Sequence, residues 1–142
     1  MALKKERFDW EIHVVVNTAC DVCGSNRKEL RDGMCDAHTH GLKKYCGREI
    51  QLVINCGLAG IGYILNSVGE MIRDGLKLED GVVFTSDKFQ DEVRIKVFET
   101  TDVQGDPIYR LILPDPEYRF PEESSEYPYN KQYCSPYLTN AS

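Results

Sequence analysis

The first regular pattern of apolar and polar positions lies in residues 10–16, WEIHVVV. The period of two predicts a strand whose apolar face carries Trp10, Ile12, Val14 and Val16. His13 would then lie on the polar face. A second strand is predicted at residues 50–56, IQLVINC, where a nearly continuous apolar run is typical of burial on both faces. We therefore expect this strand to be central, with Cys56 as a small buried side chain at its end.

A helix is predicted after Gly57, because apolar positions recur there at steps of three and four. These positions are Ile61, Ile64, Leu65, Val68, Met71 and Ile72. Gly75 would end the helix, since glycine readily takes the left-handed conformation at a helix terminus. Gly60 and Gly62 do not follow the order of a phosphate-binding loop, and close packing of helix on sheet is the preferred interpretation of both.

Two more apolar segments, residues 93–98 and 108–113, flank a turn that contains Gly105 and Asp106. This arrangement predicts a hairpin, and a short strand at residues 82–85 is expected to precede it. The sequence therefore predicts an α+β fold: a mainly antiparallel sheet with one long helix packed on it.

Residues 114–142 differ from the rest of the chain, because they are rich in proline and tyrosine and have no regular period. They could form a disordered tail, or an extended C-terminal arm whose aromatic side chains lie on the domain surface. We favour the docked arm, since aromatic side chains bury large areas and are scarce in disordered segments. The last few residues should fray.

Length and charge narrow the classes of protein that fit. A chain of 142 residues suits a single domain, residues 1–142, and the net charge of −6 gives no electrostatic reason to expect nucleic acid as a partner. No segment is typical of a signal peptide or a membrane span, so we expect a cytoplasmic protein without a membrane partner. In a reducing cytoplasm the six cysteines would be thiols or metal ligands.

The strongest chemical signal is the pair Cys20-x-x-Cys23, followed by Cys35-x-x-His38 and then His40. Paired turns of this kind can converge on a tetrahedral zinc ion, which would order a polar loop that has little core of its own. We therefore predict a structural zinc site within a metal-binding loop insertion, residues 17–40.

The fourth ligand of this zinc site is left open. If Cys35 and His38 lie in a turn, the ligand set is Cys20, Cys23, Cys35 and His38, which is the preferred set. If the residues lie in a regular strand, Cys35 and His38 point to opposite faces, so His38 and His40 would face the ion and Cys35 would be a spectator.

Three other interpretations of these residues compete with structural zinc. The thiols and histidines could be unbound, or Cys20 and Cys23 could form a redox pair, although no thioredoxin-like pattern surrounds them. Asp36, His38 and His40 could also share one strand face and hold a catalytic metal with an open position for water.

Several segments together resemble the bacterial domain-of-unknown-function family numbered 4262. These are HTHGL at residues 38–42, EIQLVIN at 49–55, ILN at 64–66, DG at 74–75 and the tail LPDPEYRFPEESSEYPYNKQ. The resemblance implies a compact α+β domain with a T-x-G-L strand start at Thr39, Gly41 and Leu42, and it implies no particular activity. As many members lack the Cys20 and Cys23 pair, the metal site would be an elaboration of this branch.

Together these patterns favour a binding or regulatory domain without an identifiable reaction, and no enzyme is predicted. The first alternative is a metal-dependent hydrolase centred on Asp36, His38 and His40. The second is an interaction module in which the tyrosine-rich arm docks on another subunit, as a homo-oligomer or with a different protein.

Overall fold

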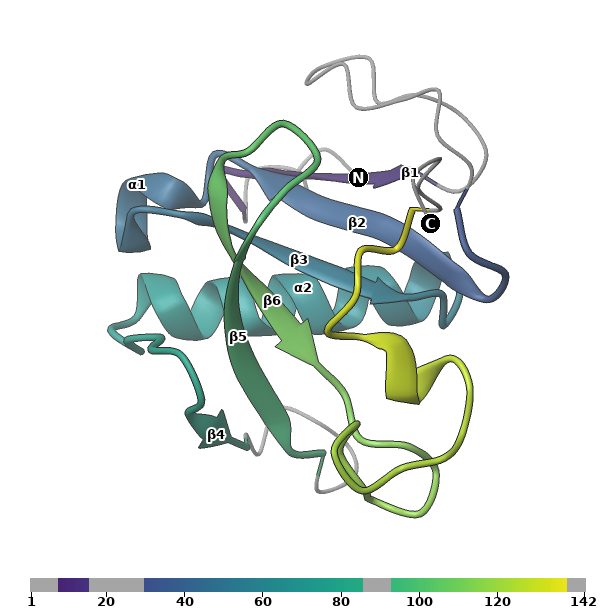
Figure 1. Cartoon of the computed structure of the whole chain (residues 1–142). Coiled ribbons are helices and arrows are strands. Elements are labelled where there is room, and N and C mark those ends of the chain that lie inside the picture. Colours follow the sequence, from purple (N-terminus) through teal and green to yellow (C-terminus); the bar gives the residue numbers. More distant parts are fainter. Residues whose placement is uncertain (1–7, 16–29, 86–92, 138–142) are drawn as a thin grey trace.

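The computed structural model describes residues 8–15, 30–85 and 93–137, which form an α+β fold around one six-stranded sheet (Figure 1). The sheet order is β1-β2-β3-β6-β5-β4. The strands are β1 (Glu11–Val15), β2 (Met34–His40), β3 (Glu49–Ile54), β4 (Val83–Phe84), β5 (Ile95–Thr101) and β6 (Pro107–Ile112). Every pairing is antiparallel except that of β3 with β6, so the predicted fold class is confirmed.

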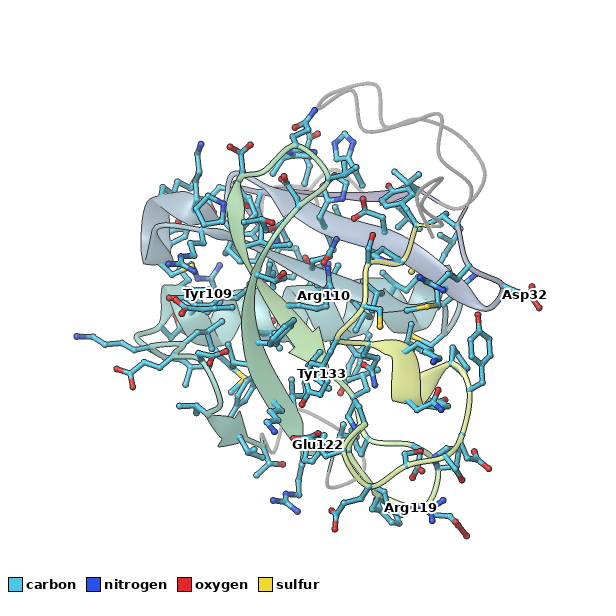
Figure 2. All side chains as sticks on the ribbon, viewed as in Figure 1. Asp32, Tyr109, Arg110, Arg119, Glu122 and Tyr133 are labelled. Carbon is cyan, nitrogen blue, oxygen red and sulfur yellow. The ribbon has the colours of Figure 1, made fainter. Side chains whose placement is uncertain are left out.

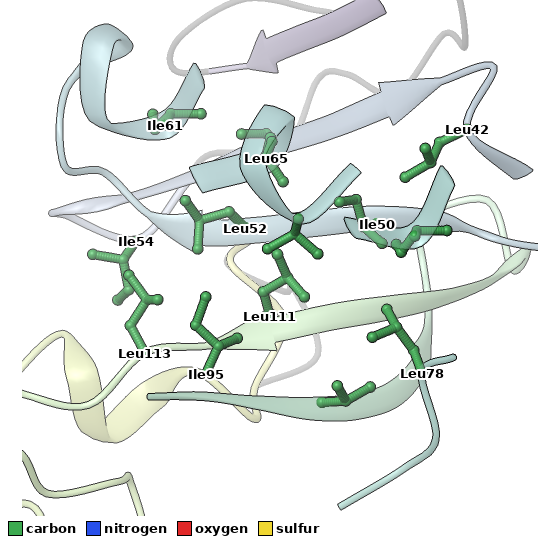
Figure 3. Close-up of a cluster of buried hydrophobic side chains, with 14 of the residues drawn as sticks. Leu42, Ile50, Leu52, Ile54, Ile61, Leu65, Leu78, Ile95, Leu111 and Leu113 are labelled. Atoms are coloured by element: carbon green, nitrogen blue, oxygen red, sulfur yellow. The ribbon is translucent and has the colours of Figure 1, made fainter. Parts of the chain in front are cut away.

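The long helix α2 (Leu58–Arg73) covers one face of the sheet and encloses the apolar core (Figures 1 and 3). Fully buried side chains of the core come from the helix and from strands β3, β5 and β6: Ile50, Leu52, Ile61, Leu65, Ile95 and Leu111. At the end of the helix, Leu76 N–H donates to Met71 O and Gly75 N–H donates to Ile72 O. Gly75 has φ +119°, so the predicted glycine terminus is confirmed.

Glycine packing in α2 differs from the prediction. A Cβ on Gly62 would meet nothing within 4 Å, so close packing does not explain this residue. Gly69 is the glycine that packs tightly, because its Cβ position lies 2.6 Å from Cζ2 of the Trp10 ring. That ring also donates from Nε1 to Oδ1 of Asn66 at 2.9 Å. The prediction for Cys56 is wrong as well, since the residue lies beyond the end of β3 and is exposed.

Strand β2 departs from the preferred prediction of a turn and matches the alternative in which these residues lie in a regular strand. Residues 34–40 were assigned to a polar loop insertion, but they pair with both β1 and β3. Thr39 therefore lies near the end of a strand, and the expected strand start at Thr39, Gly41 and Leu42 is wrong. Glu49 stabilises the turn that follows, because its carboxylate accepts bonds from Thr39 Oγ1 and from the backbone N–H groups of Gly41 and Leu42. The short helix α1 (Lys43–Cys46) comes next.

The last part of the C-terminal arm, up to residue 137, lies on the sheet face opposite α2, as the yellow segment of Figure 1 shows. The arm contains the short 3-10 helix η2 (Tyr129–Lys131). Gln132 is completely buried, and its side-chain amide bonds to both the N–H and the C=O of Leu113. These contacts match the docked arm predicted from sequence.

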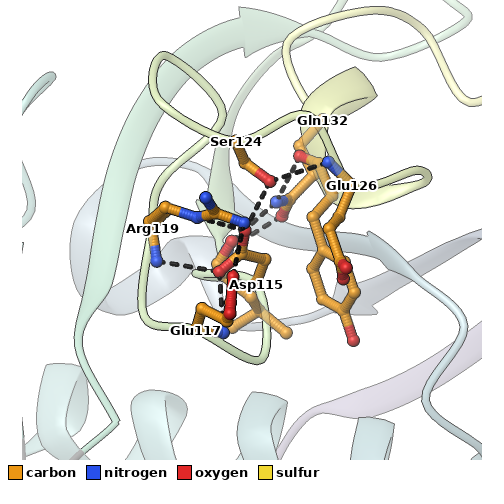
Figure 4. A network of polar contacts seen from close by, with 8 residues as sticks. Asp115, Glu117, Arg119, Ser124, Glu126 and Gln132 are labelled. Carbon is orange, nitrogen blue, oxygen red and sulfur yellow. Dashed lines mark hydrogen bonds and ion pairs between the residues drawn. The ribbon is translucent and has the colours of Figure 1, made fainter.

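Asp115 organises the first turn of the arm (Figure 4). Its Oδ1 accepts from the backbone N–H groups of Glu117 and Arg119, and its Oδ2 accepts from Arg119 Nε and Ser124 Oγ. Four donors of one segment are thereby held by a single carboxylate. In this turn the Asp115 side chain therefore binds backbone N–H groups that, in a helix or a sheet, would bond to backbone carbonyls.

Within residues 8–15, 30–85 and 93–137, no helix is both long enough and apolar enough to cross a membrane.

Candidate functional site

Three imidazole rings meet on the sheet face opposite α2, and we call His13, His38 and His40 the imidazole cluster. His13 of β1 is directly opposite His38 of β2 in the strand register. The ring centroids of His13 and His40 are 4.4 Å apart, those of His38 and His40 are 4.8 Å apart, and those of His13 and His38 are 6.2 Å apart. The alternation of side chains along a strand places His38 and His40 on one face, and antiparallel pairing brings His13 to them.

The sequence pattern places His13 on a polar strand face but does not link it to the other site residues. The signal that could have found it is the pairing of residues 11–15 with residues 36–40, which puts its ring beside theirs. That pairing depends on the register of two strands and is not visible in either segment alone.

Asp36 fixes the orientation of His38. The distance from His38 Nδ1 to Asp36 Oδ1 is 3.0 Å, and because a carboxylate only accepts, Nδ1 carries the proton. The other ring nitrogen, Nε2, is then the basic one. This arrangement of a carboxylate behind an imidazole is the usual second layer of a metal-binding histidine.

Asp36 itself is held by a buried polar chain that links the sheet to the arm. Its side chain accepts from Gln51 Nε2 at 2.9 Å and from Tyr137 Oη at 2.6 Å. Arg110 Nε donates to Gln51 Oε1 at 2.7 Å, and Arg110 Nη1 donates to the backbone oxygens of Gln132 and Cys134. Figure 2 labels Arg110 between the ribbon of the sheet and the arm.

Burial affects the pKa values of the two charged groups in this hydrogen-bonded network, Asp36 and Arg110, differently. Burial alone would raise the pKa of Asp36, but the hydrogen bonds from His38, Tyr137 and Gln51 outweigh it, and the pKa is lowered. Burial lowers the pKa of Arg110 to about 10, a value at which the guanidinium remains charged at neutral pH. The site therefore combines a buried carboxylate and a buried cation that do not touch each other directly.

Cys35 cannot share a ligand set with His38 in this structure. The turn predicted for residues 35–38 is wrong, because they lie in strand β2 and the two side chains point to opposite faces. Cys35 is completely buried in the core, with Sγ 3.6 Å from Leu52 O. Burial raises the pKa of its thiol to about 12, which disfavours the thiolate that metals bind.

The other candidate ligands are placed as follows. Cys20 and Cys23 lie outside the described residues. Within the described ranges, no group of three or more His, Cys, Asp or Glu side chains is arranged to hold a metal ion. Asp36, predicted as a ligand of an open site, is turned inward with 2% exposure, so it orients His38 here.

A cavity of about 300 Å³ adjoins the imidazole cluster. Its floor includes His38, His40 and Gln51 from strands β2 and β3. Residues of α1 and of the β5–β6 turn form other parts of its wall. The cavity gives the cluster an approach for a small molecule.

No family model, curated protein or solved structure matches this chain. The resemblance to family 4262 accordingly stays a prediction.

Proposed function

We propose that the protein is a zinc-stabilised binding domain in which Cys20, Cys23, His38 and His40 hold one structural zinc ion. The observation that carries this proposal is the imidazole cluster, with His38 oriented by the buried carboxylate of Asp36. Two thiolates and two imidazoles make a closed tetrahedral set, which leaves no position for water. This set replaces Cys35 by His40, because Cys35 faces the core.

Chain connectivity supports the inclusion of the two cysteines. Val15, which precedes the segment that contains them, pairs with Asp36. Leu30, which follows the segment, forms a β-bridge with Tyr137, whose hydroxyl binds the same Asp36. Cys20 is seven positions after His13 in the sequence, and an extended chain of that length reaches about 24 Å. Both ends of the segment are thus anchored beside the carboxylate that orients His38.

A closed site supplies folding free energy and no reaction, so the proposed role is binding or regulation. We further propose that the protein works in the cytoplasm. In support of this, the four cysteines among the described residues, Cys35, Cys46, Cys56 and Cys134, are free.

A second candidate is a metal-dependent hydrolase in which the imidazole cluster alone would hold the ion. The three rings would have to rotate to do so, because within the described residues they are not arranged as a three-ligand site. Three imidazoles plus one water are a common ligand set of catalytic zinc, and the adjoining cavity would admit a substrate. In this case His13 replaces Asp36 as the third protein ligand. The two candidates differ in whether His13 or the cysteine pair is required.

Metal analysis of protein purified without chelator tests the proposal. We expect about one zinc per chain, lost in Cys20→Ser/Cys23→Ser and in His38→Ala, and kept in His13→Ala. Cys134→Ser is the matched control, because this exposed thiol lies on the arm. Metal kept by the double cysteine variant and lost in His13→Ala would support the hydrolase instead. A wild-type protein that takes up no zinc after reduction would overturn both.

A further inference from the structure

The cavity beside the imidazole cluster is built from three parts of the fold. Strands β2 and β3 supply its floor, α1 and the turn after it supply Lys43 and Arg48, and the β5–β6 turn supplies Asp102 and Asp106. Its volume of about 300 Å³ lies at the small end of the range for ligand sites. The cavity therefore suits a compact polar molecule.

Most carboxylates that line the cavity already serve the fold. Asp36 accepts three hydrogen bonds from side chains of the sheet and the arm. Glu49 accepts three bonds from the turn after β2. Asp102 Oδ1 accepts from the backbone N–H groups of Gln104 and Asp106 and so shapes the hairpin turn. These acids leave little capacity for a ligand.

Two charged side chains of opposite sign remain. Over the part of the chain that the structure describes, neither the ammonium of Lys43 nor the carboxylate of Asp106 has an ion-pair partner, and they do not pair with each other. Lys43 comes from α1 and Asp106 from the β5–β6 turn. The cavity thus presents one positive and one negative group from two separate elements.

Arg48 is a second positive charge that lines the cavity. Its Nη1 is 2.9 Å from Glu99 Oε1, and its guanidinium lies over the Tyr109 ring at 4.9 Å from the centroid. These contacts restrain the side chain, so its remaining donors need little reorganisation to meet a carboxylate.

We propose that this cavity binds a small zwitterion, an α-amino acid or a short peptide. The carboxylate of the ligand would face Lys43 and Arg48, and its ammonium would face Asp106. Opposite charges on two elements that line one small cavity favour a molecule that carries both charges over one that carries either alone.

Titration of the full-length protein with the standard amino acids and with glycylglycine, followed by NMR chemical shifts of backbone amides, tests this proposal. We expect saturable shifts in residues 38–51 and 102–108 with at least one of these probes. The N-acetyl derivative and the carboxamide of the same probe should bind about tenfold more weakly or worse, since each lacks one charge.

Two matched variants separate the site from general surface charge. Asp106→Asn should weaken the binding of the zwitterion about tenfold or more. It should have a smaller effect on the N-acetyl derivative, because that probe has no ammonium for Asp106 to bind. Lys44→Gln is the control for Lys43→Gln, because Lys44 lies in the same helix and is already paired with Asp9. Absence of saturable binding by any probe, or equal binding of blocked and free forms, would overturn the proposal.

The zwitterion site does not depend on the zinc proposal. The titration is repeated with the Cys20→Ser/Cys23→Ser variant, provided that its amide spectrum shows a folded chain. We expect the affinity to change less than about threefold, since none of the paired charges belongs to a proposed zinc ligand. A loss of binding in this folded variant would contradict the assignment of the site to Lys43, Arg48 and Asp106.

Discussion

The two faces of the sheet are covered in different ways. On one face, α2 packs with apolar side chains and the contacts are non-directional. On the other, an arm of mostly irregular backbone is held by Gln132, Arg110, Asp36 and Tyr137 through hydrogen bonds with defined partners. A helix satisfies its own backbone groups, whereas an irregular segment needs polar side chains to do so. The difference explains why the buried charges, and with them the candidate sites, lie on the face with the arm.

Removal of the arm should give the largest effect. A chain that ends at Phe120 loses the buried Tyr137 and Gln132 and both backbone acceptors of Arg110 Nη1, so the free energy of unfolding should fall by more than about 3 kcal/mol. Urea unfolding measures this change. The number of chains per particle in solution should stay the same, because the arm lies on the sheet of its own chain.

A chain that ends at residue 137 is the control for this deletion, since all the contacts named above lie within residues 114–137. A change in the number of chains per particle on deletion after Phe120 would instead support the interaction module, with the arm joining two subunits.

The helix face can be tested with one methyl group. Gly69→Ala should destabilise the fold by about 1–3 kcal/mol, because the added Cβ would lie 2.6 Å from the Trp10 ring. Gly62→Ala is the matched control in the same helix. It meets nothing within 4 Å, so it should stabilise the fold by about 0.5–1 kcal/mol. Thermal or urea unfolding measures both, and equal effects of the two substitutions would contradict the assigned packing.

These elements also show how far sequence can predict this fold. The strand at residues 11–15, α2 and the β5–β6 hairpin carry strong local periods or turn residues, so their patterns were sufficient. Strand β2 was only the second alternative because its sequence, MCDAHTH, alternates small and polar residues, and its burial on the arm side comes from a segment about a hundred residues away. Local patterns do not contain such contacts.

The candidate site was predicted only in part for the same reason. Spacing identified His38 and His40, but His13 joins them through strand register, and Gln51 and Arg110 through partners on other elements. Cys35 was assigned by motif spacing, and the structure places it in the core. A C-x-x-H spacing favours a metal site only where the backbone turns, and here it continues as a strand.

Tyr137→Phe tests the link between the arm and His38. Loss of the hydroxyl removes one donor to the buried carboxylate of Asp36, so we expect a destabilisation of about 1–2 kcal/mol. The pKa of Asp36 should rise, because the remaining donors oppose burial less effectively. NMR titration of the side-chain carboxyl carbon measures that pKa. Tyr127→Phe is the control, since its hydroxyl donates to Asp32 O on the surface. An unchanged pKa of Asp36 would mean that the arm does not influence the imidazole cluster.

A fall in pH should weaken the arm before it weakens the face covered by α2, and this is the smallest of the expected effects. The pKa of Asp115 is about 2, below its ordinary value of 3.8. Burial raises this pKa, but the hydrogen bonds donated by Ser124, Arg119 and Glu117 lower it by a larger amount. A depressed folded-state pKa contributes stability that is complete above the unfolded value and is lost as pH falls through the folded one. The turn held by Asp115 should therefore weaken between pH 3.8 and about 2.

Among the described residues, the apolar core under α2 contains no such carboxylate, so amide exchange in the arm should accelerate in this pH range before exchange in α2 does. Ser124→Ala removes one donor and should raise the pKa of Asp115, which moves the onset of arm opening to higher pH. Hydrogen exchange followed by mass spectrometry of arm and helix peptides measures the two regions together. Simultaneous opening of both would mean that the arm and the core form one cooperative unit, in which case the polar face is as integral to the fold as the apolar one.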